Sequence, residues 1–289
     1  MKPQYFDTKE EITWCPGCSN FGILRAFKEA AVELVNKGKI KAQNITTVTG
    51  IGCSSKIYDY IKSNGFYGIH GRVLPVCLGI KVANPKLTVV GFGGDGDTYA
   101  EGTAHFVHAC RYNADLAMIV HDNQVFSLTT GQATPTSEKG FVDGSTPLGV
   151  KEKPLNPITL ALASGASFVA RGYAQDIPHL KNLMKQAIEH KGFAFIDVLQ
   201  PCLIFHNVIP FFRKHIYKLD KKHTISSFKK ALAKAQEWDY CLKDDARIPI
   251  GIFYSKKRPI FENQWPQLKK PWYTIERKAN WEEITSEFN

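Results

Sequence analysis

One stretch decides the fold class of this 289-residue chain: Leu87-Thr88-Val89-Val90-Gly91-Phe92-Gly93-Gly94-Asp95-Gly96-Asp97. Its first part, Leu87–Phe92, is a short and nearly continuous apolar run, which is typical of a strand covered on both faces of a parallel sheet. A glycine-rich, acidic turn follows, and Thr98–Tyr112 then has the pattern of a helix. The stretch therefore predicts a buried strand, a tight turn and a helix in succession.

The same order of strand, turn and helix recurs along the chain. Ile45–Thr49 predicts a strand because it is rich in β-branched residues, and it leads through Gly50–Ser55 into a predicted helix at Lys56–Ile61. Leu116–Val120 is a further predicted strand. This alternation favours an α/β fold with a doubly wound, mostly parallel sheet.

Two predicted helices have one apolar face. Asn20–Asn36 places apolar residues at steps of three and four, and Ile177–His190 follows Asp176, a suitable N-cap. The second helix lies between two further predicted strands, Ser167–Ala170 and Phe193–Leu199. Both helices fit the layers that cover a doubly wound sheet.

The composition excludes several classes of protein. Hydrophobic residues make up 44% of the chain and charged residues 22%, which excludes a disordered or collagen-like chain. No apolar run reaches the roughly 18 residues that a membrane span needs. The polar residues 1–14 lack the apolar core of a signal peptide, so we expect a cytoplasmic protein without a membrane partner.

The chain divides into two parts by character. We expect residues 1–204 to form the sheet domain, in which Thr129–Pro157 is a long, ordered functional loop. Residues 205–289 carry 17 Lys and Arg against 10 Asp and Glu, and include a predicted helix at Ile225–Trp238. We expect them to be a basic C-terminal extension that packs on the same domain or on a partner subunit. Their charge alone does not choose among an acidic protein, an anionic ligand and nucleic acid.

Three turns at predicted strand ends bear on function: Gly50–Ser55, Gly93–Asp97 and His121–Phe126. Open α/β sheets bind ligands at the carboxyl ends of their strands, and glycines let the backbone approach a phosphate closely. Asp95 and Asp97 would repel a bare phosphate, so we expect a cation between these carboxylates and the phosphate. Mg²⁺ prefers oxygen ligands, which Asp95, the Asn123 side chain and a carbonyl near Val125 would supply. Each turn on its own is also a common structural feature.

The seven cysteines form the second group of candidates. Their odd number argues against a disulfide framework. Cys15 and Cys18 have a spacing that lets two thiolates share one metal or cluster, and Cys53 and Cys202 again follow predicted strands. Spacing alone leaves a thioredoxin-like pair, a zinc site and an iron–sulfur cluster open. The other cysteines have no predicted chemistry: Cys77 and Cys110, expected to be buried hydrophobes, and Cys241.

Together these motifs resemble a known family. The spacing from Gly94-Asp95-Gly96 to Asn123 is similar to the thiamine diphosphate motif, in which the Asp, the Asn and a carbonyl two residues later bind Mg²⁺. A wider set of motifs resembles the β subunit of the 2-oxoacid:ferredoxin oxidoreductases: Trp14–Cys18, Gly50–Lys56, His70-Gly71-Arg72, Gly93–Asp97, Asp122–Thr129, Gly131-Gln132, Pro135-Thr136, Gln200-Pro201-Cys202 and Arg247–Gly251.

The resemblance implies roles for individual residues. The four cysteines Cys15, Cys18, Cys53 and Cys202 would bind one [4Fe–4S] cluster, and Asp95, Asn123 and Val125 would hold Mg²⁺. Lys56 would contact the substrate or the diphosphate, with a solvated helix face as the alternative. The cofactor-binding residues would be Ile51, Gly52, Cys53, Ser54, His70, Gly94, Asp95, Gly96, Asp97, Asn123, Val125, Leu128 and Thr129.

The resemblance also implies an activity and partners. The family carries out the coenzyme A-dependent oxidative decarboxylation of a 2-oxoacid, pyruvate or 2-oxoglutarate, to acyl-CoA and CO₂, and passes the electrons to ferredoxin. Because the chain has room for one thiamine-binding sheet, we expect an α subunit to carry the pyrimidine-binding domain, and we expect no nucleic-acid partner. Two alternatives stay open: a non-redox thiamine diphosphate enzyme subunit with zinc or free cysteines, and a basic, zinc-containing nucleic-acid-binding protein.

Overall fold

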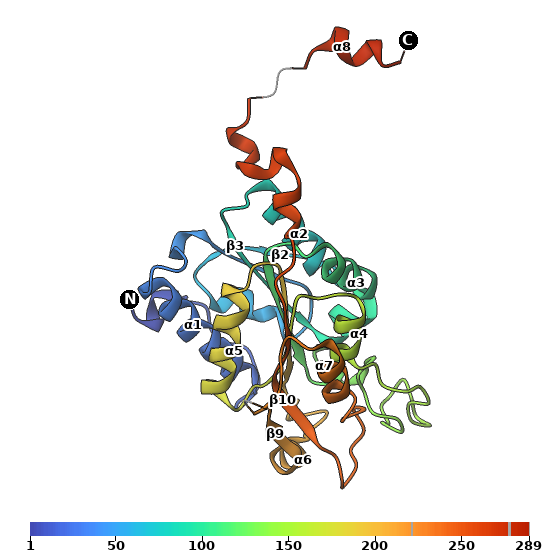
Figure 1. The fold of residues 1–289 in the computed structure, drawn as a ribbon. Helices are drawn as coiled ribbons and strands as arrows, with labels where there is room; N and C mark the ends of the chain where they lie inside the picture. The colour runs from blue at the N-terminus through green and yellow to red at the C-terminus, as the bar shows by residue number, and fades with distance from the viewer. Residues whose placement is uncertain (221, 277–278, 289) are drawn as a thin grey trace.

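An eight-stranded sheet runs through the centre of the chain, which a computed structural model describes over residues 1–220, 222–276 and 279–288 (Figure 1). Its strand order is β2-β1-β3-β4-β8-β7-β10-β9. All neighbouring strands are parallel except β7 and β10. The strands are β1 (Ile45–Thr49), β2 (Asn64–Tyr67), β3 (Thr88–Gly94), β4 (Leu116–Asp122), β7 (Phe168–Tyr173), β8 (Phe193–Leu199), β9 (Ile216–Lys218) and β10 (Ile248–Ser255).

The central strands are buried on both faces, which explains their apolar sequences. Every residue of β1, β4, β7 and β8 is buried. Such strands lie between two layers of helices, as in other doubly wound sheets. The predicted α/β class with a mostly parallel sheet is therefore confirmed, and the predicted bounds of β1 and β8 are those of the structure.

Helices cover both faces of the sheet (Figure 1). On one face, α1 (Asn20–Asn36) and α5 (Ile177–Glu189) pack on each other and share a core with β3 and β4. Asp176 caps α5 as predicted, because its side chain accepts a hydrogen bond from the His179 amide. The other face is covered by α2 (Val73–Ala83), α3 (Thr103–Tyr112), α4 (Pro157–Ala163) and α7 (Phe228–Ala235).

Ion pairs connect the exposed sides of α1 and α5. Glu33 of α1 accepts from Lys181 at 2.7 Å and from Lys185 at 2.5 Å. Hydrogen bonds from these two lysines lower the pKa of Glu33 to about 2. The pairs join helices that are far apart in the sequence.

A fully buried ion pair lies between two central strands. Arg171 on β7 and Asp197 on β8 are register partners, both are 0% exposed, and Arg171 Nε lies 3.6 Å from Asp197 Oδ2. The hydroxyls of Tyr99 and Tyr240 donate to the same carboxylate at 2.8 and 2.7 Å. The guanidinium also lies over the Trp238 ring, 5.2 Å from its centroid. Both charges are thus compensated inside the sheet.

Several predicted elements differ from the observed ones in extent. The predicted helix at Lys56–Ile61 is a 3-10 helix, Ser55–Tyr60. Thr98–Tyr112 is divided into a π-helical turn, Asp97–Glu101, and α3. The loop Thr129–Pro157 contains one strand, β6 (Gln132–Ala133), which pairs with β5 (Val125–Phe126).

Residues after 204 contribute to the same sheet. They include α6 (Ile209–His215), strands β9 and β10, and α7, which packs on β10 and α4. The predicted helix Ile225–Trp238 is shorter, as α7. Beyond β10, short 3-10 turns lead to α8 (Trp281–Ser286), which lies away from the body of the molecule (Figure 1). Among the described residues, no helix has the length and apolar character needed to cross a membrane.

Candidate functional site

The predicted cofactor-binding residues surround one cavity at the carboxyl ends of β1, β3 and β4. This cavity measures about 70 Å³. Phe126 and Ser127 line it as well, although sequence patterns assigned them no role. The full lining is Ile51, Gly52, Cys53, Ser54, His70, Gly94, Asp95, Gly96, Asp97, Asn123, Val125, Phe126, Ser127, Leu128 and Thr129.

Asp95 lies buried at the end of β3, and two threonines hold its carboxylate. Thr134 and Thr136 donate to Asp95 Oδ2 at 2.5 and 2.9 Å, and Thr136 also bonds Asp122 at 2.9 Å. Burial raises the pKa of Asp95 to about 6, against the lowering effect of these hydrogen bonds. Burial and the nearby Asp197 and Asp95 raise the pKa of Asp122 as well. A divalent cation beside Asp95 would offset the cost of its buried charge.

Asp97 ties two neighbouring turns together. Its Oδ1 accepts from the Ile51 amide at 3.1 Å and from the Gly71 amide at 2.8 Å. The ring of His70 lies 3.5 Å away from the same oxygen. A side chain at position 50 would have its Cβ only 2.2 Å from Asp97 Oδ2, so only glycine fits at Gly50. Asp97 therefore fixes two of the turns that form the cavity wall.

The next turn brings Asn123 and Val125 to the same side. Gln124 between them has a left-handed backbone with φ of +62°, which is rare for a residue with a side chain. Asn123 Oδ1 accepts from the Val125 amide at 3.2 Å. Its Nδ2 donates to Ser127 at 3.3 Å and to Gln200 at 3.1 Å. Strained backbone of this kind is concentrated at functional sites.

The four cysteines predicted to share a cluster influence one another's ionisation, and none of them is in a disulfide. Burial raises the pKa of Cys18 to about 11, with smaller contributions from Cys53, Cys202 and Cys15. Burial also raises the pKa of Cys53, and Cys202 and Cys15 raise it further by smaller amounts. Within the described ranges, no three His, Cys, Asp or Glu side chains are close enough to hold a single metal ion.

The other residues with sequence-based assignments lie elsewhere. Cys77 and Cys110 are 0% exposed in the core under α2 and α3, so the prediction that they are buried hydrophobes is confirmed. Cys241 is half-buried in the region after α7. Lys56 does not line the cavity; its ammonium group donates to the Thr13 hydroxyl at 3.1 Å. Its proposed contact with substrate remains a prediction.

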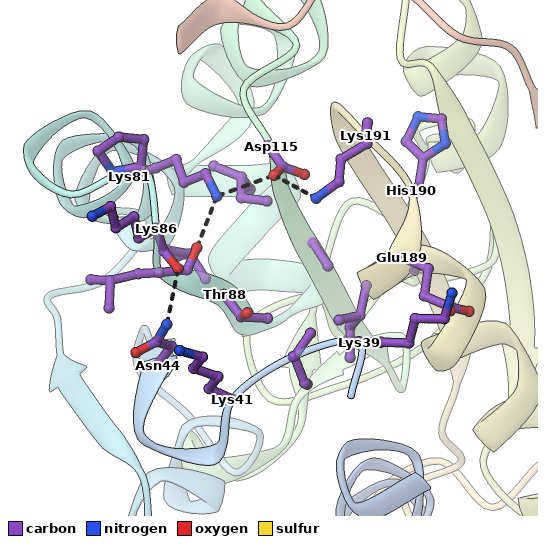
Figure 2. A pocket seen from close by; sticks show the side chains of 18 of the residues that line it. Lys39, Lys41, Asn44, Lys81, Lys86, Thr88, Asp115, Glu189, His190 and Lys191 are labelled. Carbon is purple, nitrogen blue, oxygen red and sulfur yellow. Dashed lines mark hydrogen bonds and ion pairs between the residues drawn. The ribbon is translucent and has the colours of Figure 1, made fainter. Parts of the chain in front are cut away.

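A larger cavity of about 460 Å³ lies at the opposite edge of the sheet, where β3 and β4 begin (Figure 2). Helices α1, α2 and α5 end there, and the last carbonyls of a helix carry partial negative charge. Lys81 donates to the Leu87 carbonyl at 2.8 Å and to Asp115 at 3.2 Å. The cationic side chains complement the helix ends, in contrast to a phosphate site, which uses helix amino ends. The lysines of this cavity are Lys39, Lys41, Lys81, Lys86 and Lys191.

Sequence reasoning missed the residues that support the site. Thr134 and Thr136 orient Asp95, but neither was assigned a role, although Pro135-Thr136 belongs to the motifs that resemble the family. Gln200 contacts Asn123, and its position directly before Pro201-Cys202 was the only signal. Such supporting contacts join segments far apart in the chain, and no local pattern encodes them.

Comparison with known proteins agrees with this geometry. Residues 50–198 match the family model "Thiamine pyrophosphate enzyme, C-terminal TPP binding domain", in which thiamine pyrophosphate is thiamine diphosphate. Residues 205–270 match the family model for the C-terminal part of the pyruvate ferredoxin oxidoreductase beta chain. The chain is thus matched by two models along most of its length.

Similar proteins cover nearly the whole chain. A 2-oxoacid:ferredoxin oxidoreductase subunit beta from a Sulfolobus species is 45% identical over 267 residues, covering 87% of this chain and 84% of the relative. The subunit beta of 2-oxoacid:ferredoxin oxidoreductase 1 from Aeropyrum pernix is 41% identical, covering 95% and 87%. The solved 2-oxoglutarate:ferredoxin oxidoreductase from Magnetococcus marinus, with 2-oxoglutarate, coenzyme A and succinyl-CoA bound, superposes with a TM-score of 0.89 at 30% identity, covering 100% and 96%. The chain therefore belongs to the β subunits of the thiamine diphosphate-dependent 2-oxoacid:ferredoxin oxidoreductases.

Proposed function

We propose that this β subunit binds thiamine diphosphate through Mg²⁺ and holds one [4Fe–4S] cluster beside it. In this proposal it takes part in the oxidative decarboxylation of a 2-oxoacid, with coenzyme A as acyl acceptor and ferredoxin as electron acceptor. One observation carries the proposal: the predicted cofactor residues line a single cavity, and Cys53 belongs both to that cavity and to the group of four thiols.

The residues present suit a Mg²⁺ diphosphate group. Asp95, Asn123 and the Val125 carbonyl offer oxygen ligands from adjacent strand ends, the kind of ligand that Mg²⁺ takes. The hydroxyl of Ser54 is buried and lines the cavity without a hydrogen-bond partner among the described residues, so it is available to a phosphate oxygen. Gly94 and Gly96 leave the backbone open to close approach.

The four thiols suit an iron–sulfur cluster in number and kind. Cys18 is influenced electrostatically by Cys15, Cys53 and Cys202. A four-iron cluster is larger than one ion and takes four cysteine ligands. We therefore assign these four residues to the cluster.

The bound cofactor would supply the electron sink for decarboxylation, and this chain's residues prepare its place. Asp97 fixes the turns that carry Ile51 and Gly71, so contacts within the chain itself hold this part of the cavity wall. The left-handed backbone at Gln124 lets Asn123 and Val125 both line the cavity. Because Cys53, a proposed cluster ligand, also lines the cavity, it would hold the cluster close to the cofactor, where the cluster could accept electrons.

The fold also supports the need for a partner subunit. The described residues form one large sheet, and the cavity at its strand ends suits the metal and the diphosphate. In this proposal the chain provides the metal and diphosphate end, and an α subunit would supply the pyrimidine-binding domain. We assign residues 1–204 to the cofactor-binding domain and 205–289 to an extension that completes the sheet and faces partners. Among 2-oxoacids, 2-oxoglutarate is the first to test, since the similar solved enzyme is bound to it.

The test is anaerobic purification of the enzyme with iron, sulfide, zinc and thiamine diphosphate assays. We expect about four irons per chain. Cys202→Ser should lose iron and keep the cofactor, Asp95→Ala should lose Mg²⁺-dependent cofactor binding and keep iron, and Cys241→Ser is the matched control that keeps both. A colourless wild-type protein, or one that holds zinc, would refute the proposal.

A further inference from the structure

We infer that Gln200 is a positioning residue that connects the two cofactor sites. Its side-chain amide fixes the orientation of the Asn123 amide and donates a hydrogen bond to the sulfur of Cys18. The inference rests on the proposed function, because Asn123 is there a Mg²⁺ ligand and Cys18 a cluster ligand. Neither the family models nor the sequence assigned Gln200 a role.

The backbone holds Gln200 firmly in place. It follows β8 directly, is 1% exposed, and its amide donates to the Asp122 carbonyl at 2.8 Å. This bond continues the pairing of β4 with β8 by one residue beyond the strands. Gln200 therefore lies beside Asn123 and two residues before Cys202.

The side-chain contacts of Gln200 define one orientation of its amide. Gln200 Oε1 accepts from Asn123 Nδ2 at 3.1 Å. Gln200 Nε2 donates to the Pro201 carbonyl at 3.3 Å and lies 3.8 Å from Cys18 Sγ. If the amide were turned by 180°, two NH₂ groups would face each other and two oxygens would meet. Only the observed orientation satisfies all the partners.

This orientation decides which end of Asn123 faces the metal. Asn123 Nδ2 is occupied by Gln200 and Ser127, so its oxygen is left for the Val125 amide and for a cation. Without Gln200 only the Val125 amide would still select this orientation, and an NH₂ group turned toward the cation cannot bind Mg²⁺. Outer partners of this kind typically contribute about 10–100-fold to metal affinity.

The second contact acts on the cluster. A hydrogen bond to a ligand sulfur stabilises the negative charge that reduction adds, and so raises the reduction potential. Gln200 Nε2 is such a donor to Cys18 Sγ, in a half-buried environment. The same side chain therefore supports metal binding and sets the potential of the first electron acceptor.

Two substitutions separate these effects in the purified holoenzyme. Gln200→Leu removes both contacts, and we expect Mg²⁺-dependent thiamine diphosphate affinity to fall about 10–100-fold and the cluster potential to fall. Gln200→Glu keeps an oxygen toward Asn123 but loses the donor to Cys18, so the affinity should stay within about threefold while the potential falls. Gln186→Leu, on the exposed side of α5, is the control and should change neither.

The readouts are isothermal titration of Mg²⁺ with thiamine diphosphate, and redox titration followed by electron paramagnetic resonance. Unchanged affinity and potential in Gln200→Leu would overturn the inference. If that variant does not fold, an unchanged potential in Gln200→Glu overturns it equally. Wild-type enzyme that lacks iron or does not bind the cofactor would instead refute the proposed function, so the two failures are distinguishable.

Discussion

Replacement of Asp97 by alanine tests whether its carboxylate holds two turns of the cavity wall in place. The substitution removes two hydrogen bonds, from the amides of Ile51 and Gly71, to a buried carboxylate. Each bond to a charged acceptor contributes about 1.5–3 kcal/mol. Burial raises the pKa of Asp97, so part of this gain is offset by the cost of burying the charge. We therefore expect Asp97→Ala to lower the free energy of unfolding by about 2–4 kcal/mol.

The assay is urea denaturation of the full chain without cofactors, followed by tryptophan fluorescence. Asp97→Asn keeps one oxygen as an acceptor but loses the charge, so its loss should be smaller, about 1–2 kcal/mol. Asp244→Ala, at an exposed position, is the matched control. If Asp97→Ala stayed within about 0.5 kcal/mol of the wild type, the carboxylate would not hold the two turns and our account of the wall would be wrong.

Three further predictions concern charged groups. Arg171→Met leaves the buried Asp197 unpaired and should lower the free energy of unfolding by about 3–5 kcal/mol. The double variant Arg171→Met with Asp197→Leu should recover much of this lost free energy of unfolding in urea titrations. If the single and the double variant lost the same amount, the pairing of Arg171 with Asp197 would be contradicted. The lowered pKa of Glu33 means that its pairing stabilises the fold above the unfolded pKa of about 4.3 and is lost as the pH falls toward about 2. Because the Glu33 side chain is 34% exposed, the free energy of unfolding of the wild type should exceed that of Glu33→Gln by only about 1 kcal/mol at neutral pH. If this difference stayed the same at pH 2 or in high salt, the prediction would be refuted. Burial raises the pKa of Asp95 to about 6, so calorimetric Mg²⁺-dependent cofactor affinity should fall about tenfold per pH unit below 6; a flat profile would exclude Asp95 as ligand.

Local patterns predicted the elements that alternate cleanly or are continuously apolar. Asn20–Asn36 and Ile45–Thr49 have the predicted bounds because each buries a regular face or a whole strand. The helix α2 had no such signal. Val73–Ala83 contains Pro75 and Gly79, and its own residues are apolar on nearly every side, so no single apolar face stands out. Strand β10 was also missed, since it contains a proline and runs antiparallel beside β7. Only tertiary packing decides such segments.

The site was predictable to the extent that its residues lie at strand ends. A strand end is a local property, and parallel strands bring their ends to one edge, so the residues after β1, β3 and β4 could be grouped from sequence. The threonines that hold Asp95 belong to a loop without periodicity, and the interaction of Gln200 with Asn123 spans 77 positions. Their roles depend on the path of the folded chain and could not be derived from spacing.

The bond between the Asp122 carbonyl and the Gln200 amide has a consequence for how the enzyme is made. It forms only after β4 has paired with β8, across a long intervening segment, and such distant contacts are slow to form. The proposed cluster ligands likewise extend from Cys15 to Cys202, so a ribosome must release most of the chain before they can meet. The proposed cluster could therefore be completed only after most of the chain has been synthesised, so its assembly would be a late step.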